Sequence, residues 1–246
     1  MKFDLVSDLH IDCWEENTDW IARKNSDILV VAGDICDDQD IGIEYIKMLD
    51  NIYNTVLWVD GNHEHEKSKK YPIESCRDYH TKVNHLGFLP TKSVIIENTA
   101  FIGACGWWDY CFAEPVLSKE YVKKEFGERV NKQAVDEFEE LVKQDKEWIV
   151  KELETVKAES VVMVTHTLPH RSVYCENEHI RNDWYRGMFG NTLMETVRDS
   201  RIKYWCYGHS HHQSHKTINS VEYVCNPRGR PKTNHYANYK LVTLEI

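Results

Sequence analysis

Five short hydrophobic segments of the sequence each end at a residue type that can bind a metal ion. The segments, at residues 2–7, 27–32, 55–59, 160–165 and 203–207, have the length and composition of β-strands. Helix-like stretches lie among the early segments, between 27–32 and 55–59 and after 55–59, which is the pattern of an α/β fold. In open α/β sheets ligands bind outside the carboxyl ends of the strands, so the loops that follow should meet at one site. These loops contain Asp8, His10, Asp34, Asn62, His166, His209 and His211.

The remaining segments extend this α/β architecture. Further strand-like runs lie at 93–97, 100–104, 221–225 and 239–246, and amphipathic helical patterns lie at 40–51 and 73–84. The longest helical pattern extends from 118 to 156, and a break at Gly127 would divide it into two helices. From Lys203 onward the chain is rich in strands, which suits a second sheet packed against the first. We therefore expect one domain over residues 1–246, with two mixed β-sheets packed as a sandwich and flanked by helices.

Composition narrows the setting in which the protein works. The formal net charge of −10 argues against a broad basic face for duplex DNA, although it leaves nucleic-acid chemistry open. The eight cysteines are scattered without a CxxC pair, so we expect reduced thiols. No apolar run approaches the roughly 20 residues that cross a bilayer, and the first residues lack the apolar stretch of a signal peptide. We therefore expect a cytoplasmic protein with no membrane partner.

The metal-capable residues are weak signals individually, but their order along the chain is highly specific. They occur as Asp-Leu-His at 8–10, Gly-Asp at 33–34, Gly-Asn-His-Glu at 61–64, Thr-His at 165–166 and Gly-His-Ser-His at 208–211. Mixed nitrogen and oxygen donors suit Mn, Fe, Zn, Ni or Co better than Ca, and the lack of a thiolate disfavours a closed structural zinc site. Glycines directly before Asp34, Asn62 and His209 would let the backbone turn sharply where each side chain must point inward.

This order of motifs resembles that of the calcineurin-like metallophosphoesterase superfamily, and the match covers nearly the whole chain. The resemblance implies the calcineurin-like phosphoesterase fold and a binuclear centre of two divalent transition-metal ions, with Mn expected first. It also implies how the ligands divide between the ions, with Asp34 as the bridge. Asp8, His10, Asp34 and His211 would hold the first ion, and Asn62, His166 and His209 would complete the second.

The implied reaction is hydrolysis of a phosphate mono- or diester of a small or nucleotide-like substrate. Two ions about 3.5–4 Å apart need an anionic bridge, and they would acidify a bridging water to the hydroxide that attacks phosphorus. His63 is expected to be catalytic, as the general acid that protonates the leaving alkoxide, and its alternative role is to orient the centre. His65, in the polar run at 64–66, is expected to be a solvated residue.

Three residues are expected to contact the substrate: Trp108, His170 and Arg228. Trp108 follows the strand-like run at 100–104 and could stack a flat group, whereas packing between the sheet and the long helix is the competing interpretation. His170 follows a ligand closely, and Arg228 lies in an Asn-Pro-Arg-Gly segment that resembles one in many bacterial-type members of the superfamily. Either residue can also serve the structure alone. The polar stretch at 171–186 either rims the cleft or is a solvated loop.

Three other functions remain as alternatives. A nuclease acting on DNA or RNA would need a channel and more basic surface than this acidic chain offers. A protein phosphatase of this superfamily usually carries an arginine in its second motif, and the run Gly-Asp-Ile-Cys-Asp-Asp at 33–38 lacks it. A non-catalytic metal-binding scaffold would be expected to have lost ligands, and all seven positions are intact.

Overall fold

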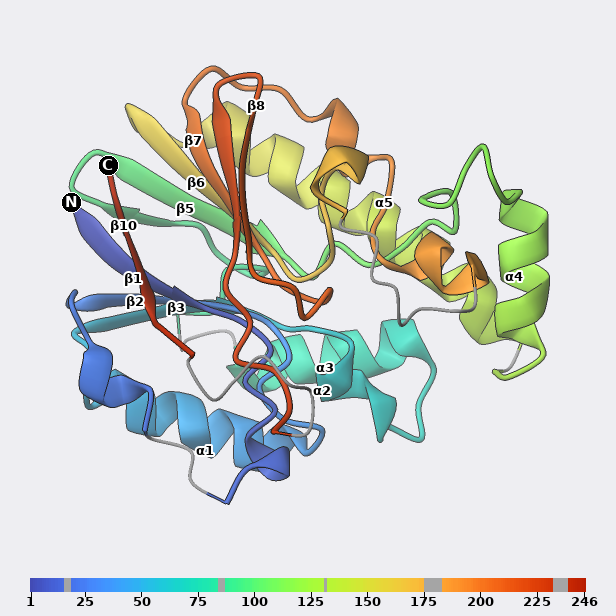
Figure 1. The fold of residues 1–246 in the computed structure, drawn as a ribbon, viewed down its shortest axis with the longest axis horizontal. Coiled ribbons are helices and arrows are strands. Elements are labelled where there is room, and N and C mark those ends of the chain that lie inside the picture. The colour runs from blue at the N-terminus through green and yellow to red at the C-terminus, as the bar shows by residue number, and fades with distance from the viewer. Residues whose placement is uncertain (16–18, 84–86, 131, 175–182, 232–238) are drawn as a thin grey trace.

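Two β-sheets packed face to face form the centre of the protein (Figure 1). The computed structural model describes residues 1–15, 19–83, 87–130, 132–174, 183–231 and 239–246. The first sheet has four strands in the order β10-β1-β2-β3. Its three N-terminal strands are parallel, and β10 pairs antiparallel with β1. The strands are β1 (Lys2–Val6), β2 (Ile28–Ala32), β3 (Thr55–Val59) and β10 (Val242–Glu245).

The second sheet has six strands in the order β4-β5-β6-β7-β9-β8. The four central strands are parallel, and both edge strands pair antiparallel with their neighbours. This arrangement is a mixed sheet, as expected from the sequence. The strands are β4 (Val94–Ile96), β5 (Thr99–Ala104), β6 (Ser160–Thr165), β7 (Ile202–Tyr207), β8 (Ser214–Ile218) and β9 (Val221–Cys225).

A dry core lies between the two sheets. Leu5 and Val30 of the first sheet pack in the same cluster as Phe101 and Val162 of the second, and all four are fully buried. Because the central strands are covered on both faces, they carry nearly continuous apolar runs, as parallel strands usually do. This packing fixes the position of one sheet relative to the other, and with it the relative positions of the loops at the strand ends.

Helices cover the outer faces of the sandwich. α1 and α3 pack on the first sheet through Leu49 and Tyr79, and α5 packs on the second through Ile149 and Leu153 (Figure 1). α1 begins where the Asp38 side chain accepts hydrogen bonds from two backbone N–H groups, a typical N-cap. The helices are α1 (Gln39–Asp50), α2 (His63–Glu66), α3 (Pro72–Val83), α4 (Lys119–Gly127) and α5 (Lys132–Thr155). Short 3₁₀ helices are η1 (Ile11–Cys13), η2 (Ile21–Arg23), η3 (Arg171–Val173), η4 (Asp183–Met188) and η5 (Met194–Thr196).

The predicted elements agree with this architecture, and the expected long helix is divided at Gly127 into α4 and α5, as its sequence indicated. Three features differ from the prediction. β8 was not predicted, because its alternating half-exposed polar residues at 214–218 lack the apolar content of the other strands. The second sheet begins at β4 rather than at Lys203. The last strand, β10, returns to the first sheet instead of extending the second.

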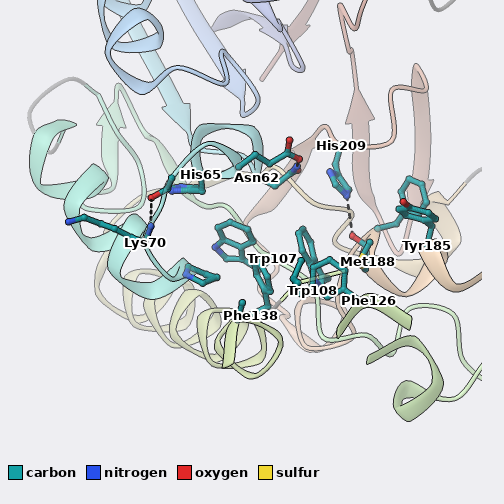
Figure 2. A pocket seen from close by; sticks show the side chains of 16 residues that line it. Asn62, His65, Lys70, Trp107, Trp108, Phe126, Phe138, Tyr185, Met188 and His209 are labelled. Carbon is teal, nitrogen blue, oxygen red and sulfur yellow. Dashed lines mark hydrogen bonds between the residues drawn. The ribbon is translucent and has the colours of Figure 1, made fainter. Parts of the chain in front are cut away.

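An aromatic cluster lies between the loop that follows β5 and the helix α5. Trp107 and Trp108 are 2% and 6% exposed, and both pack against Phe138 of α5 with ring centroids 5.0 and 4.6 Å away. The two tryptophans therefore pack between the sheet and the long helix, as one of the two interpretations of the sequence predicted. The same rings also form one wall of a cavity that Asn62 and His209 line from the opposite side (Figure 2).

Two further expectations concern thiols and membranes. The seven cysteines in the described part of the chain are free thiols, and Cys175 lies outside the described residues. Among the helices that the structure describes, none has both the length and the apolar character needed to cross a bilayer.

Candidate metal centre

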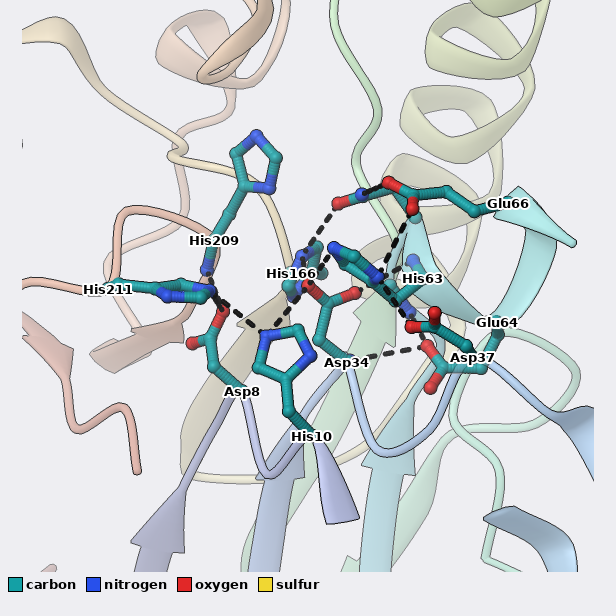
Figure 3. A network of polar contacts seen from close by, with 12 residues as sticks. Asp8, His10, Asp34, Asp37, His63, Glu64, Glu66, His166, His209 and His211 are labelled. Atoms are coloured by element: carbon teal, nitrogen blue, oxygen red, sulfur yellow. Dashed lines mark hydrogen bonds and ion pairs between the residues drawn. The ribbon is translucent and has the colours of Figure 1, made fainter. Parts of the chain in front are cut away.

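The loops at the carboxyl ends of five strands meet at one place between the sheets (Figure 3). β1, β2 and β3 supply one side of this place, and β6 and β7 supply the other. Among the groups of metal-capable side chains there, two share Asp34, and a third joins His10 to Asp37 and His63; within each group the donor atoms are all within 4.8 Å of one another. Asp8, His10, Asp34 and His211 form the first group, and Asp34, His166 and His209 form the second. All of these positions were predicted from the sequence as ligands.

Asp34 belongs to both groups. Its Oδ2 atom is 3.7 Å from Nε2 of His10 in the first group and 3.2 Å from Nε2 of His166 in the second. Its Oδ1 atom accepts a hydrogen bond of 2.9 Å from the backbone N–H of His63. The carboxylate is therefore held at the boundary between two clusters of donors, which is the position that a bridging ligand requires.

The first group brings two imidazole nitrogens and a carboxylate oxygen close together. Nε2 of His10 and Nε2 of His211 face each other at 3.0 Å, so at least one must carry a proton if no cation lies between them. His211 Nε2 is also 3.3 Å from Oδ1 of Asp8. Carboxylate and imidazole lone pairs that converge in this way fit a divalent cation with mixed oxygen and nitrogen ligands.

In the second group, backbone carbonyls fix the orientation of both histidine rings. Nδ1 of His166 is 2.9 Å from the Ala32 carbonyl, and Nε2 of His209 is 3.1 Å from the Met188 carbonyl. A carbonyl only accepts, so each of these nitrogens must donate a proton. The other ring nitrogen is directed into the centre and can bind a metal once it gives up any proton, an arrangement common for metal-binding histidines.

Asn62 completes the second group through its amide oxygen. Its Oδ1 atom is 3.2 Å from Nε2 of His166, while its Nδ2 atom donates a hydrogen bond of 3.0 Å to Glu66. The contact with Glu66 determines which end of the amide faces the histidine. The oxygen, which is the end that can bind a cation, points into the centre.

The backbone at the centre adopts unusual conformations. Asp8, His10, Asp34, His209 and His211 have φ values of 49°, 41°, 55°, 67° and 51°, in the left-handed region that non-glycine residues rarely occupy. Such conformations cost on the order of 1–3 kcal/mol each and gather at functional sites.

The glycines that precede three of the ligand positions serve two different purposes. Gly33 has a φ of 78°, so it provides the sharp turn that the sequence suggested. Gly61 and Gly208 provide space instead. A Cβ atom at Gly61 would collide with the Asp34 carboxylate, and one at Gly208 would lie 2.8 Å from Asp8 Oδ2.

The carboxylate of Glu64 joins the loops after β2 and β3, and its role was not predicted from the sequence. Its two oxygens accept hydrogen bonds from the backbone N–H groups of Asp34, Ile35, Cys36 and Gly61, at 3.2, 2.6, 3.1 and 2.6 Å. Burial and the nearby charge of Asp34 raise the pKa of Glu64 to about 7. The side chain is 1% exposed, so it links the two loops from inside the protein.

Charges within the centre are strongly coupled. Burial alone would raise the pKa of Asp8, but the neighbouring His211 lowers that pKa to about 2. Burial would lower the pKa of His166, yet the Asp34 carboxylate raises it to about 10. The buried carboxylates thus remain anionic and favour positive charge beside them, which further supports the fit of the donor set to cations.

His63 lies beside Asp34 and is held by a second carboxylate. Its Nδ1 atom is 2.7 Å from Asp37, and its Nε2 atom is 3.9 Å from Asp34 Oδ2. Burial would lower the pKa of His63, but Asp34, Glu66 and Asp37 raise it above the ordinary value. A guanidinium nitrogen of Arg230 approaches the same ring, 3.1 Å from Nε2. The structure thus places Arg230, rather than Arg228, against His63.

The other residues expected to contact the substrate lie in different settings. Arg228 is 1% exposed and is held by the Trp14 ring, 4.0 Å from its guanidinium carbon, and by Asp19 at 2.6 Å. Its backbone N–H donates to the Ser7 carbonyl, so its segment braces the loop that carries the first ligands. Nδ1 of His170 accepts a hydrogen bond from the Ser172 N–H. Among the described residues, neither belongs to a metal-capable group or lines the aromatic cavity.

The expectation that His65 is solvated was wrong. Its ring is buried, with Nε2 2.9 Å from Asp60 and Nδ1 2.9 Å from Ser75. The short helix α2 turns this side of the polar run toward the interior, where Asp60 supplies a buried charged partner. From the polar stretch at 171–186, Tyr185 lines the cavity, while His179 and Arg181 lie outside the described residues.

Comparisons with known proteins identify the family. The model of the calcineurin-like phosphoesterase family matches residues 1–213, and the chain belongs to this family. An uncharacterized protein, L509, of Acanthamoeba polyphaga mimivirus is 22% identical over 269 residues, covering 98% of this chain and 95% of the viral protein.

Two solved structures share the fold. Phosphopantetheinyl hydrolase from Mycobacterium tuberculosis superimposes with a TM-score of 0.74 at 19% identity, covering 98% of this chain and 95% of that one. A dimetal phosphatase from Danio rerio superimposes with a TM-score of 0.57 at 15% identity, covering 99% and 91%. At these identities the similarity establishes the calcineurin-like phosphoesterase fold and leaves the substrate open.

Replacement of Glu64 should loosen two loops at once. Glu64→Ala leaves four backbone N–H groups without their acceptor, so we expect a loss of about 3 kcal/mol or more in the free energy of unfolding. Glu64→Gln should cost less, because it keeps one acceptor oxygen and removes the repulsion with Asp34. Chemical denaturation of the wild type, both variants and the exposed control Glu44→Ala measures the order. Equal stability of the wild type and Glu64→Ala would contradict the linking role.

Asp34→Asn tests the shared position of Asp34. The change keeps the shape of the side chain but removes the charge that both groups of donors use. We expect the wild type to retain two metal ions per chain after dialysis and the variant to retain at most one, as measured by elemental analysis. Asp27→Asn, at an exposed carboxylate, serves as the control. A variant that still holds two ions would rule out the bridge.

Proposed function

We propose that this member of the calcineurin-like phosphoesterase family hydrolyses a phosphate mono- or diester at a centre that holds two divalent metal ions. The observation that carries the proposal is the carboxylate of Asp34, which two converging groups of donors share. One group alone would suit a single structural ion. Two groups joined by a carboxylate suit the paired ions that metal-dependent hydrolysis of phosphate esters uses.

The side chains divide between the ions according to these two groups. When bound, such a pair of ions acidifies water and offsets negative charge on the phosphoryl oxygens. The donors are nitrogen and oxygen without sulfur, so Mn is the first ion to supply, followed by Fe, Zn, Ni and Co. We assign Asp8, His10, Asp34 and His211 to the first ion, and Asp34, Asn62, His166 and His209 to the second.

His63 is assigned as the general acid. The contact between its Nδ1 atom and Asp37 fixes the ring so that Nε2 lies 3.9 Å from Asp34 Oδ2, on the side that the Arg230 guanidinium also approaches. A ring that is protonated and oriented in this way can deliver a proton to the oxygen of a leaving alcohol. Its pairing with Asp37 supports the catalytic role over a purely orienting one, because the carboxylate stabilises the protonated ring.

The proposal is tested with the purified protein supplied with Mn²⁺. A chromogenic phosphomonoester and a chromogenic phosphodiester, assayed side by side, should show hydrolysis of at least one, and removal of the metal with a chelator should abolish it. A panel of small phosphate esters then defines the scope, and the name of the mycobacterial structure adds phosphopantetheine esters to that panel. Metal bound at two ions per chain with no turnover of any ester would favour a non-catalytic metal-binding scaffold.

The role of His63 predicts a dependence on the leaving group. His63→Ala should lower turnover of an alkyl phosphate ester by about 10²–10⁴, because a poor leaving group needs a proton. Turnover of the corresponding nitrophenyl ester should fall much less, because nitrophenolate leaves without one. The ratio of the two rates is the measurement, and His215→Ala, at a half-exposed ion pair away from the donor groups, is the control. Equal losses for both esters would exclude the general-acid role.

A further inference from the structure

A cavity of about 570 Å³ lies directly beside the proposed metal centre. Asn62 and His209, which we assign to the second ion, form one side of it, and the rings of Trp107, Trp108 and Phe138 form the opposite side (Figure 2). A substrate whose phosphoryl group is bound at the centre therefore has this cavity as the adjacent space for its organic part. Cavities of this size are in the range that holds small organic ligands.

The aromatic side of the cavity is a rigid surface. Trp108 packs on Phe138 at an interplanar angle of 30°, and Trp107 contacts both of these rings, with centroids 5.5 and 5.0 Å away. The Trp108 ring is also nearly parallel to His209, at 18° with centroids 6.1 Å apart. Each ring is held by its neighbours, so little side-chain freedom remains to be lost when a ligand binds. A fixed array of rings favours a flat, unsaturated group over a flexible chain.

The rim of the cavity is polar, in contrast to its aromatic side. Glu66, Ser68 and Lys70 lie along the side formed by the loop after α2. Lys70 is paired with Glu74 and Asp78, so the rim is electrically balanced rather than a basic patch for a second phosphate. Glu66 and Lys70 are exposed and already have partners within the protein, so the outer edge of a ligand at this rim meets polar groups and water. A nucleobase has apolar faces and a polar edge, and the cavity offers a matching surface to each.

Resting on the proposed function, we propose that this cavity binds a nucleobase-like heteroaromatic ring, and that the substrate is a small nucleotide ester rather than a sugar or alkyl phosphate. In this arrangement the ring contacts Phe138 and those parts of the largely buried tryptophans that line the cavity, while the phosphate reaches the ions beside Asn62 and His209. A stacked base typically contributes enough to change affinity roughly 5- to 150-fold. The contribution of the ring can be isolated by comparing ligands that differ only in the base.

Adenosine 5′-phosphate and ribose 5-phosphate form such a pair, because they share the phosphate, the sugar and the leaving alcohol. With the Mn²⁺-loaded protein, we expect KM for the nucleotide to be at least tenfold lower. Ala134→Trp, which places a large side chain inside the cavity from α5, should reduce this ratio toward one. The milder Phe138→Leu removes a ring but keeps apolar volume, and it should reduce the ratio in the same direction. Lys151→Trp, on the exposed face of the same helix, should leave both constants unchanged.

Binding of adenosine and ribose to the metal-free protein, measured by calorimetry, separates this proposal from the proposed function. Adenosine should bind and ribose should not, and Ala134→Trp should abolish the adenosine signal. Adenosine binding without hydrolysis of any ester would leave the base site standing and overturn the phosphoesterase assignment. Hydrolysis with equal KM for the two phosphates, or a preference for octyl phosphate over both, would overturn the base site and leave the phosphoesterase assignment standing.

Discussion

Both loops that carry the central carboxylate and the amide ligand depend on one buried side chain, that of Glu64. Four backbone N–H groups from the ends of two neighbouring strands donate to it, so the loop of Asp34 cannot move without the loop of Asn62. Burial first, and repulsion by Asp34 second, raise the pKa of this carboxylate. The protein therefore accepts an unfavourable pair of like charges in order to fix the distance between two ligand-bearing loops. The packing of the two sheets then brings the loops of the second sheet against them.

The loops that form the metal centre lower the free energy of unfolding of the protein. Five of the seven assigned ligand residues have left-handed backbone conformations, and several buried carboxylates and imidazoles lie within a few ångströms of one another. The sandwich core, which is dry and fully buried, compensates for this strain. Two bound cations would relieve much of the remaining repulsion between carboxylates, so metal binding and folding should be thermodynamically linked.

The sequence predicted those features that depend on the order of residue types along the chain. The strands before Asp8, Asp34, Asn62, His166 and His209 were placed to within one residue at each end, because apolar runs and the polar residues that end them are local signals. Features that depend on contacts between distant segments were not predicted. The local sequence indicates that Glu64 and His65 are exposed. In the folded protein Glu64 is instead buried against the loop of Asp34, and His65 is buried against Asp60. The approach of Arg230 to His63 joins residues 167 positions apart, which no local pattern encodes. Periodicity also failed at β8, where a polar edge strand lacks an apolar face.

The antiparallel pairing of β10 with β1 places the first and last residues of the chain together at one edge of the first sheet (Figure 1). Met1 and Ile246 are joined there by backbone hydrogen bonds of 2.9 Å in both directions. β1 runs from this edge toward Asp8. Met1 and Ile246 are therefore separated from the metal centre by the length of this five-residue strand, about 17 Å. A fusion partner, an affinity tag or a surface tether attached at either terminus would thus leave the protein at the end of β1 opposite the loop of Asp8. A short linker could therefore join Met1 to Ile246 without rearrangement of the sheet.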